Sequence, residues 1–263
     1  MGSRRRVWAR VAVAAGLVVG VQGDATAGPA GLPDLLPDLR MAPLYGLVLE
    51  TTPRGRTRLH FGTIGWNVGD GPIEARGRRI APGDLVMRVT QRIYNSAGGH
   101  RDRVTPALMI YETGDHHDHW HVRQFTVVQM YKRGAPGGNV YGLRKIGYCL
   151  LDARRMANPP PASPQERSYR SAACGTRSSR RVRTGLSVGY GDDYPPDYAH
   201  QWMDITGLTP GVYRICTTID PLDEFVEKNE RNNQRWTDVR INIAAGRARI
   251  LASAIAPCGP HRP

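Results

Sequence analysis

A run of histidines in the middle of the chain carries the strongest chemical signal in the sequence. Four of the eight histidines fall within the six positions from His116 to His121. Side chains alternate along a β-strand, so His117, His119 and His121 would share one face. Neutral imidazoles bind divalent ions such as Zn²⁺ and Cu²⁺ at about 2 Å. The spacing therefore predicts a metal site held by these three residues, and copper binds such sites more tightly than zinc.

The same spacing sets a geometric condition on that site. Along a flat strand the outer two histidines would lie about 13 Å apart, from a rise of roughly 3.3 Å per residue. Three ligands therefore converge only if the strand bends or bulges; otherwise two of them act together with a ligand from elsewhere. His116 points to the opposite face with Asp118, where it either orients a ligand or faces solvent.

The segments around the histidines predict a β-rich chain. Short apolar or alternating segments stand between turns rich in Gly and Pro, and no long helical pattern or fixed-period repeat appears. This spacing predicts an all-β fold, a β-sandwich with long irregular loops and little helix. The longest predicted loop covers residues 156–183, and the predicted strands are residues 58–64, 85–93, 108–111, 119–131, 212–219, 239–243 and 248–255.

The first residues predict export. Four arginines precede an apolar run over residues 11–21, and residues 25–27 (Ala-Thr-Ala) form a small-x-small cleavage site. This pattern is typical of a secretory signal peptide over residues 1–27, followed by a single domain over residues 28–263. The arginines also resemble a twin-arginine export motif. An N-terminal membrane anchor is the alternative, but the apolar run is short for a span, so we expect a secreted protein without stable membrane insertion.

The chain is strongly basic. Its net charge of +13 falls to about +10 once the first 27 residues are removed. The arginine-rich run over residues 177–183 can touch a nucleic acid or an anionic surface, but such a run is more often a solvated loop. An exported protein meets little nucleic acid, so we expect no nucleic-acid partner.

The chain contains four cysteines. An even number of cysteines in an exported protein indicates two disulfides, and their spacing contains no CxxC metal pair. Of the three possible connectivities we favour Cys149–Cys174 with Cys216–Cys258, because each bridge would tie neighbouring segments. The alternative is one bridge and two free thiols.

Four segments of the chain resemble, in the same order, segments of the lysyl oxidase family. The histidine strand is similar to the family's H-x-H-x-H copper motif, and the segment around Lys145 is similar to G-H-K-A-S-F-C-L-E-D, with a Lys four residues before a Cys. The remaining two are similar to G-L-S…Q-W-x-D-I-T and to E-x-D-x-x-N-N. The matching residues here are 117–121 with Phe125, 142–152, 185–206 and 227–233.

The resemblance implies a cofactor made by the protein itself. In the family the matching Lys and Tyr are joined into lysyl tyrosylquinone, which carries over to Lys145 and Tyr194, with copper on His117, His119 and His121. A phenol near a redox metal can be oxidised to a quinone, and a lysine amine can add to that ring. We therefore expect a secreted copper-dependent amine oxidase.

Such an enzyme converts primary amines to aldehydes with O₂ and releases H₂O₂ and ammonia. Its substrates would be primary amines, with lysine side chains of proteins included by the family resemblance. The reaction needs a base that removes the substrate's α-proton. Asp204 and Asp197 are the candidates, and Asp204 is equally suited to a structural role at a strand end.

The resemblance also implies a second metal site suited to calcium. Glu227, Asn229, Asn232 and Asn233 match oxygen ligands of the family, and Asp34 matches its N-terminal ligand. Hard oxygen ligands suit Ca²⁺. Asn stands at position 229 where the family has Asp, which lowers the charge of the site, and an Asn-rich capped turn is the alternative interpretation.

Two departures from the family pattern leave other functions open. The interval between Lys145 and Tyr194 carries an insertion rich in Pro and Arg, and Tyr190 and His200 stand where the family has a bridged cysteine pair. One alternative is a copper- or zinc-binding sandwich without quinone or catalysis. Another is a zinc hydrolase with an open water position, although no HExxH motif supports it.

Overall fold

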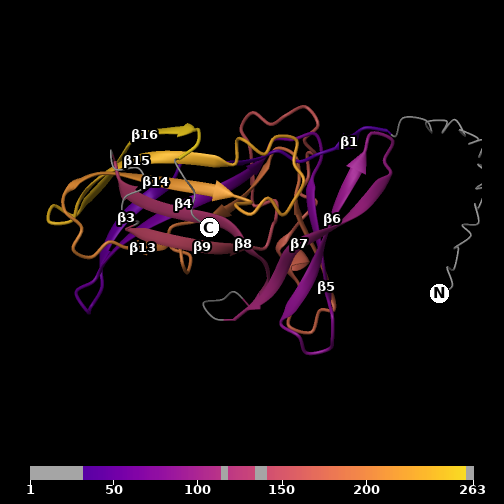
Figure 1. Ribbon diagram of the computed structural model, residues 1–263, viewed down its shortest axis with the longest axis horizontal. Coiled ribbons are helices and arrows are strands. Elements are labelled where there is room, and N and C mark those ends of the chain that lie inside the picture. The colour runs from indigo at the N-terminus through magenta and orange to yellow at the C-terminus, as the bar shows by residue number, and fades with distance from the viewer. Residues whose placement is uncertain (1–31, 114–117, 134–140, 259–263) are drawn as a thin grey trace, which may run out of the picture. The chain divides into compact units, whose positions relative to one another are not determined.

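The computed structural model describes residues 32–113, 118–133 and 141–258, and from Leu32 onward the chain forms one compact unit. Strands dominate the described residues and the helical content is one short 3₁₀ turn, so the predicted all-β fold with little helix is confirmed (Figure 1). Within these residues no helix has the length and hydrophobicity needed to cross a membrane.

The elements follow one another along the chain without a repeating unit. They are β1 (Asp34–Leu35), β2 (Leu39–Met41), β3 (Tyr45–Thr51), β4 (Thr57–Asn67), β5 (Ile73–Arg79), β6 (Val86–Asn95), β7 (His100–Glu112), β8 (His119–Lys132), β9 (Gly142–Tyr148), β10 (Arg154–Arg155), η1 (Ser171–Cys174), β11 (Arg181–Leu186), β12 (Tyr190–Tyr194), β13 (Trp202–Asp204), β14 (Gly211–Ile219), β15 (Gln234–Asn242) and β16 (Arg247–Ile255).

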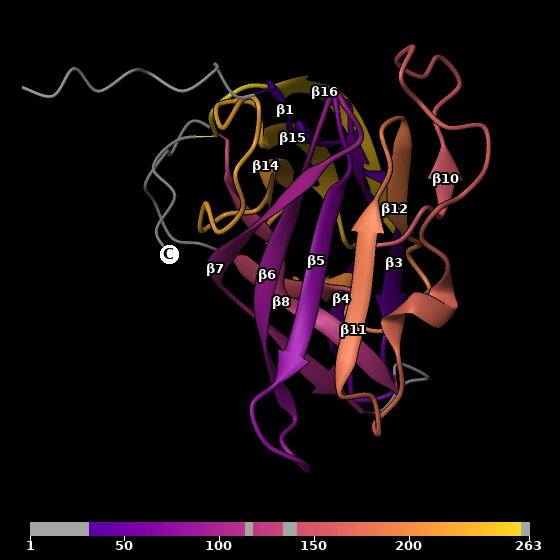
Figure 2. The same ribbon diagram turned by 90° about the vertical axis from the view of Figure 1, so that its right-hand side faces the viewer.

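Two antiparallel sheets form the sandwich. The larger sheet has the order β11-β5-β6-β7-β8-β14-β15-β16, with β1 beside β6 and β9 beside β8. In the smaller sheet β4 is central, because β2, β3, β12 and β13 all pair with it, and β10 extends it beyond β12. The large sheet twists strongly: β5 to β7 and β14 to β16 point in clearly different directions in Figure 1, and Figure 2 shows the edge formed by β11, β5 and β6.

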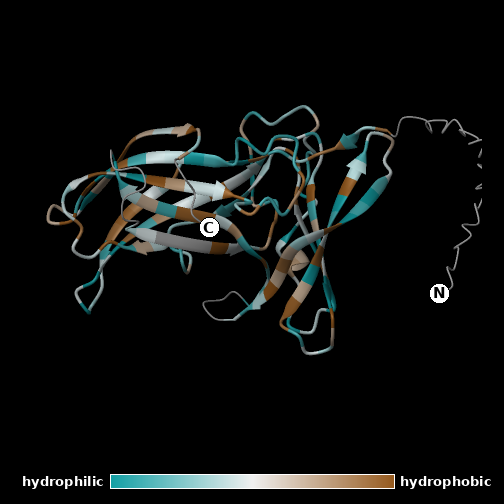
Figure 3. Cartoon of the chain, in the orientation of Figure 1, coloured by the Kyte–Doolittle hydropathy of each residue, from teal (hydrophilic) through white to brown (hydrophobic). Residues whose placement is uncertain are grey.

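The inner faces of the two sheets supply the hydrophobic core. Along β6, Met87 and Val89 are buried while Arg88 between them is exposed, and Figure 3 shows similar alternation on other strands. Phe61 of β4 and Trp120 of β8 are fully buried from opposite sheets. Burying such a side chain stabilises the fold by roughly 1.5–3 kcal/mol, and a slip of one residue would expose it, so burial fixes the register of both strands.

Strand β8 carries an irregularity close to the histidines. Gln124 has a φ of 53°, and the pairing of β8 with β9 shifts register between Val122 and Thr126. On its other side, β8 pairs with β7 up to Val122 and with β14 from Thr126 onward. A bulge of this kind bends a strand and breaks its pairing. It separates the histidine-bearing end of β8 from the part that lies between β9 and β14.

The expected disulfides are both present. Cys149–Cys174 joins the end of β9 to η1, and Cys216–Cys258 joins β14 to the segment after β16. The favoured connectivity is therefore confirmed, and the described residues contain no free cysteine. The first bridge anchors the long segment between β9 and β11.

Part of the arginine-rich run is a strand, which corrects the prediction of a loop over residues 156–183. Arg181, Val182 and Arg183 begin β11, which pairs with β5. Val182 is buried and its two neighbours are exposed, so the run alternates as a half-buried strand does. A single valine between arginines is too weak an apolar signal to predict a strand from the sequence.

Candidate metal centre

His119 and His121 face one another at the start of β8. Their Nε2 atoms lie 2.8 Å apart, and the ring centroids are 4.5 Å apart with the planes at 89°. His121 is buried and His119 is half-buried. These two side chains share a face, as the alternation of a strand predicts. His117, the third expected ligand, and His116 lie outside the described residues.

The two imidazoles fit a shared metal ion. At this distance one ring nitrogen can donate a hydrogen bond to the other, and both can also bind one ion. Two nitrogens bound at right angles to an ion about 2 Å away would lie about 2.8 Å apart, which matches the observed separation. Imidazole nitrogens suit both Cu²⁺ and Zn²⁺.

Glu112 and Gly147 enclose His121 from neighbouring strands. A carboxylate oxygen of Glu112, at the end of β7, lies 3.7 Å from His121 Nδ1, within the range of an ion pair and beyond that of a hydrogen bond. A Cβ atom at position 147 of β9 would lie 3.1 Å from His121 Cβ and 3.3 Å from Glu112 Oε1. Glycine therefore allows β9 to pass close to the histidine. Neither residue was identified from the sequence, because neither carries a motif of its own.

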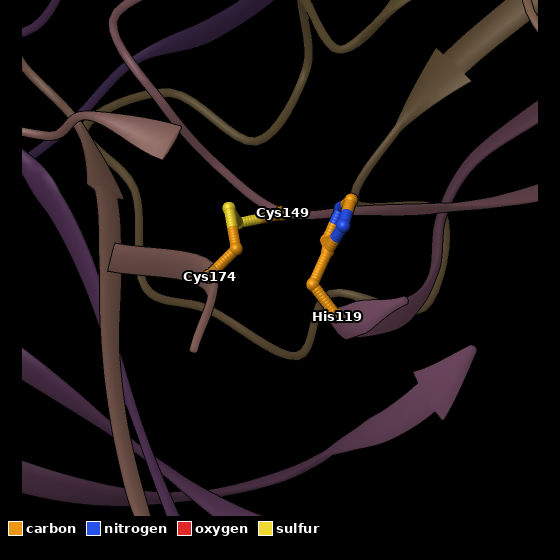
Figure 4. A group of neighbouring side chains, drawn as sticks. All are labelled: His119, Cys149 and Cys174. Atoms are coloured by element: carbon orange, nitrogen blue, oxygen red, sulfur yellow. A yellow bond between two sulfur atoms is a disulfide. The ribbon is translucent and has the colours of Figure 1, made fainter. Parts of the chain in front are cut away.

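The Cys149–Cys174 disulfide lies against His119. One ligand-type atom from each of these three residues lies within 4.8 Å of the other two. Figure 4 shows the three side chains gathered in one place. The two sulfurs are bonded to each other, so they are not thiolate ligands. Their role here is positional: the bridge holds the end of β9 and the turn η1 beside the imidazole.

Tyr194 reaches the same region from the smaller sheet. The backbone N–H of Cys149 donates a 3.2 Å hydrogen bond to the phenol oxygen of Tyr194. The Tyr194 ring stacks on Tyr148, with centroids 4.1 Å apart and the planes at 12°. Burial, followed by the nearby carboxyl of Asp192, raises the pKa of Tyr194 well above its usual value. The structure thus brings Tyr194 to the cysteine whose disulfide lies near His119.

Lys145 lies on β9, the strand that leads into Cys149. Its backbone pairs with Val127 of β8, and its side chain lies outside what the structure describes. Four residues of strand separate the Cα atoms of Lys145 and Cys149 by about 13 Å, at roughly 3.3 Å per residue. The lysine and the tyrosine therefore belong to the same neighbourhood, but the backbone does not place them side by side.

Asp192 is a buried carboxyl group on the strand that carries Tyr194, and no sequence motif marks it. It lies two residues earlier on β12, so both side chains share a face of that strand. Asp192 is buried, and its Oδ2 has no hydrogen-bond partner among the described residues. Burial, with the neighbouring carboxylates of Asp193 and Asp152, raises the pKa of Asp192 well above its usual value.

The two carboxylates expected to act as a base differ in their surroundings. Asp204 on β13 pairs with Arg58 of β4, whereas Tyr194 pairs with Thr63 of the same strand. The two pairing positions are five residues apart along β4. Its carboxylate accepts hydrogen bonds from Thr206, which together lower the pKa of Asp204. Asp197 is exposed on the loop after β12. The structure does not bring Asp204 together with Tyr194, and its contacts are those of a structural residue at a strand end.

The oxygen-rich site contains three of its five expected members and one unexpected residue. Asn232 Nδ2 donates to Asp38 Oδ1 at 2.7 Å, and Asn233 Nδ2 donates to Glu227 Oε1 at 2.7 Å. Burial raises the pKa of Glu227 to about 9. The Oδ1 atoms of both asparagines are buried without hydrogen-bond partners among the described residues, which is the environment that a bound cation would satisfy.

Asp34 and Asn229 are not part of that cluster. The Asp34 carboxylate forms an ion pair of 2.6 Å with Arg101, and Asn229 is exposed and accepts a hydrogen bond from the backbone of Arg231. The stretch from Pro33 repeats its Pro-Asp-Leu motif four residues later, and the second copy supplies the buried Asp38. That repeat is the signal from which Asp38 could have been found.

Comparison with known proteins decides the family. The family model for lysyl oxidase matches residues 77–249, about two thirds of the chain. The chain belongs to the lysyl oxidase family. The match spans the histidine strand, Lys145, Tyr194 and the acidic loop at Glu227, and it excludes the N-terminal segment that carries Asp38.

Similarity to individual members of the lysyl oxidase family is modest. The chain is 30% identical to lysyl oxidase homolog 4 of Mus musculus over 118 residues, which is 44% of this chain and 14% of that protein. It is 28% identical to lysyl oxidase homolog 2 of Gallus gallus over 150 residues, 56% of this chain and 17% of the relative. The similarity therefore spans less than a fifth of the length of these relatives.

Proposed function

We propose that this member of the lysyl oxidase family is a secreted copper-dependent amine oxidase that oxidatively deaminates primary amines. The observation that supports this most directly is the series of neighbours that links β8, which carries the histidines, to the buried phenol of Tyr194. His119 lies against the Cys149–Cys174 disulfide, and the Cys149 N–H donates to Tyr194. A redox metal held by the histidines would therefore be near the one tyrosine that the family resemblance selects.

The histidines would hold copper, and Lys145 with Tyr194 would form lysyl tyrosylquinone. The bound copper and the quinone would together supply the electron-accepting carbonyl and the reaction with O₂. The protein's own contribution is positional. The disulfide holds Cys149 near His119, and the stacked ring of Tyr148 keeps water from one face of Tyr194.

Asp192 replaces Asp204 as the proposed proton acceptor. It lies on the same face of β12 as Tyr194, while Asp204 is held by Thr206 on another strand. Burial raises the pKa of Asp192 well above its usual value, which makes the carboxylate a stronger base than an exposed aspartate. The buried and unpartnered Oδ2 is the atom that would take the α-proton of the bound amine.

In this proposal, β9 moves when the cross-link forms. The Cα atom of Lys145 lies about 13 Å from that of Cys149 along the strand. Strand β9 pairs with β8 alone among the described strands, so it is an edge strand. An edge strand is held by hydrogen bonds on one side and can shift at lower cost than a central one. We propose that a shift of β9 brings the lysine amine to the Tyr194 ring.

The remaining parts of the proposal concern location and substrate. A signal peptide over residues 1–27 would export the domain, and those residues lie outside the described part of the chain. The substrates are primary amines, including lysine side chains of proteins, with O₂ as the second substrate. We propose no nucleic-acid partner for the catalytic site.

The cross-link itself is the test. The protein is loaded with copper, exposed to O₂ and digested with protease, and mass spectrometry then searches for a peptide pair joined through Lys145 and Tyr194. We expect the joined pair in the wild type, no joined pair in Lys145→Arg, and an unchanged pair in Lys132→Arg, which alters an exposed lysine on β8. Peroxide release from a simple primary amine should follow the same pattern.

The buried Tyr190 supports one alternative function. It occupies a position where the family has a bridged cysteine, and its hydroxyl donates to the carbonyl oxygen of Gln165 instead. A protein that kept the fold and lost the quinone would be a secreted copper- or zinc-binding module. Two unlinked peptides after copper and O₂ treatment would establish that alternative and end the oxidase proposal.

A further inference from the structure

The loop that joins β5 to β6 exposes apolar side chains at one end of the large sheet. Ile80 is 64% exposed, and Leu85 and Val86 are each 38% exposed. In both ribbon views this loop projects past the neighbouring strands (Figures 1 and 2). The carboxylate of Asp84 is turned back into the loop, where it accepts a hydrogen bond from the Ala81 N–H. The tip therefore presents apolar groups outward.

Arginines surround this apolar tip. The register of β11, β5 and β6 places Arg181 opposite Arg78, and Arg78 opposite Arg88, so three exposed arginines form a row across three strands. Like charges directly opposite each other destabilise a sheet. Repulsion within the arginine row therefore destabilises the isolated protein, and an anionic surface placed over the row would offset that repulsion.

A hollow lies between the row and the tip. It has a volume of about 290 Å³, and its lining combines Arg78, Arg79, Arg180 and Arg181 with the apolar residues 80–82. Guanidinium groups form paired hydrogen bonds with phosphate oxygens. Apolar and cationic groups in one hollow suit a ligand that is itself amphipathic.

We propose that this end of the molecule docks on an anionic lipid bilayer. Ile80 and Leu85 would enter the boundary between headgroups and acyl chains, while the arginine row would contact lipid phosphates. Charge complementarity alone would fit any polyanion. The exposed apolar tip selects a lipid surface, because Ile80 and Leu85 gain nothing from contact with a hydrophilic polymer.

Docking in this way would set the candidate metal centre close to the surface. Val86 pairs with Ile110 of β7, and Ile110 pairs with His121 of β8. Two strand spacings, about 10 Å in total, separate Val86 from the histidine. The docking inference does not depend on the proposed oxidase reaction, because it concerns a different surface and is tested by binding alone.

Vesicle sedimentation tests the inference with the domain that follows residue 27. We expect binding to phosphatidylcholine vesicles that contain phosphatidylglycerol, weak binding to phosphatidylcholine alone, and release at high salt, where charges are screened. The double variant Arg78→Gln/Arg181→Gln should bind the anionic vesicles roughly 20- to 30-fold more weakly, since each arginine near such a surface contributes about 1 kcal/mol. The control Arg240→Gln/Arg249→Gln removes another exposed cross-strand pair and should bind normally.

A second variant distinguishes a lipid surface from a soluble polyanion. Ile80→Ser/Leu85→Ser should weaken binding to anionic vesicles and leave binding to heparin unchanged. Val104→Ser, which alters a valine that is 80% exposed on β7, is the matched control and should change neither. Thermal unfolding of each variant checks that the fold is retained. Vesicle binding that survives both double variants, or that tracks heparin binding in all of them, would overturn the proposal.

Discussion

The backbone N–H of Cys149 and the phenol oxygen of Tyr194 are joined by a hydrogen bond of 3.2 Å. The bond connects the end of β9 in the large sheet to the end of β12 in the small one. Cys149 is also bonded to Cys174, and the bridge lies beside His119. Cys149 thus lies between Tyr194 and His119. We therefore expect the Cys149–Cys174 disulfide to affect copper binding as well as the stability of the fold.

Removing each disulfide separately tests that relationship. Replacement of Cys149 and Cys174 by Ser should lower the free energy of unfolding by about 2–4 kcal/mol and also weaken copper binding. Replacement of Cys216 and Cys258 by Ser should cost a similar amount of stability and leave copper affinity unchanged, because that bridge lies on β14. Thermal unfolding and copper titration separate the two effects. Equal copper affinity in both variants would show that the first bridge has no role in the site.

Gly147→Ala should damage the metal centre. The added Cβ would lie 3.1 Å from His121 Cβ, which is closer than nine in ten such contacts, so the histidine or β9 must shift by a few tenths of an ångström. We expect copper affinity to fall about 10-fold or more, in line with the loss of a group that orients a ligand. Gly211→Ala is the control, because its Cβ would meet its nearest neighbour at an ordinary 3.5 Å. The measurement is copper titration followed by absorbance.

The sequence was sufficient for the features set by local pattern. Alternation along the segment that became β8 placed His119 and His121 on one face, and proximity in the chain identified both disulfides. It was insufficient where contacts join distant elements. Asp192 is significant because β12 packs inside the sandwich, and Gly147 because β9 crosses His121.

The oxygen-rich site also shows that contacts between distant segments cannot be found from local sequence. Two copies of Pro-Asp-Leu stand four residues apart, and nothing local distinguishes Asp34 from Asp38. The fold decides between them, since Arg101 pairs with the first and Asn232 donates to the second. Strand β11 was missed because its buried face contains few large apolar residues, Val182 and Leu186, and its pairing with β5 joins segments far apart in the sequence.

Asp192→Asn should abolish most of the amine oxidation while preserving the cofactor. An amide has nearly the shape of the carboxyl but cannot accept the proton, and the loss of a general base typically lowers kcat by about 10²–10⁴-fold. Asp204→Asn removes the base expected from the sequence and should leave kcat close to that of the wild type. Peroxide release gives kcat, and the Lys145–Tyr194 peptide shows that the cross-link still forms. A large loss in Asp204→Asn alone would return the role to that residue.

Glu227 makes the stability of the fold depend on pH. Its pKa is raised from 4.5 to about 9, so the folded protein holds this proton more tightly than the unfolded chain does. Its contribution is therefore complete below pH 4.5 and is lost as the pH rises to about 9, at up to about 1.4 kcal/mol per pH unit. Wild type and Glu227→Gln should have similar stability near pH 4.5, and the variant should become progressively the more stable of the two as the pH rises toward 9, as measured by denaturant unfolding at several pH values.

A cation would reverse that pH dependence, because it would favour the ionised carboxylate of Glu227. Millimolar Ca²⁺ should then raise the melting temperature, and more at pH 8 than at pH 5. Asp38→Asn should lose the effect, since its carboxylate belongs to the buried cluster with Asn232, while Asp34→Asn should retain it, since Asp34 pairs with Arg101.

If calcium leaves the melting temperature unchanged at both pH values, the asparagine-rich turn is capped by its own hydrogen bonds. If Asp34→Asn is the variant that loses the effect, the N-terminal segment must rearrange on binding.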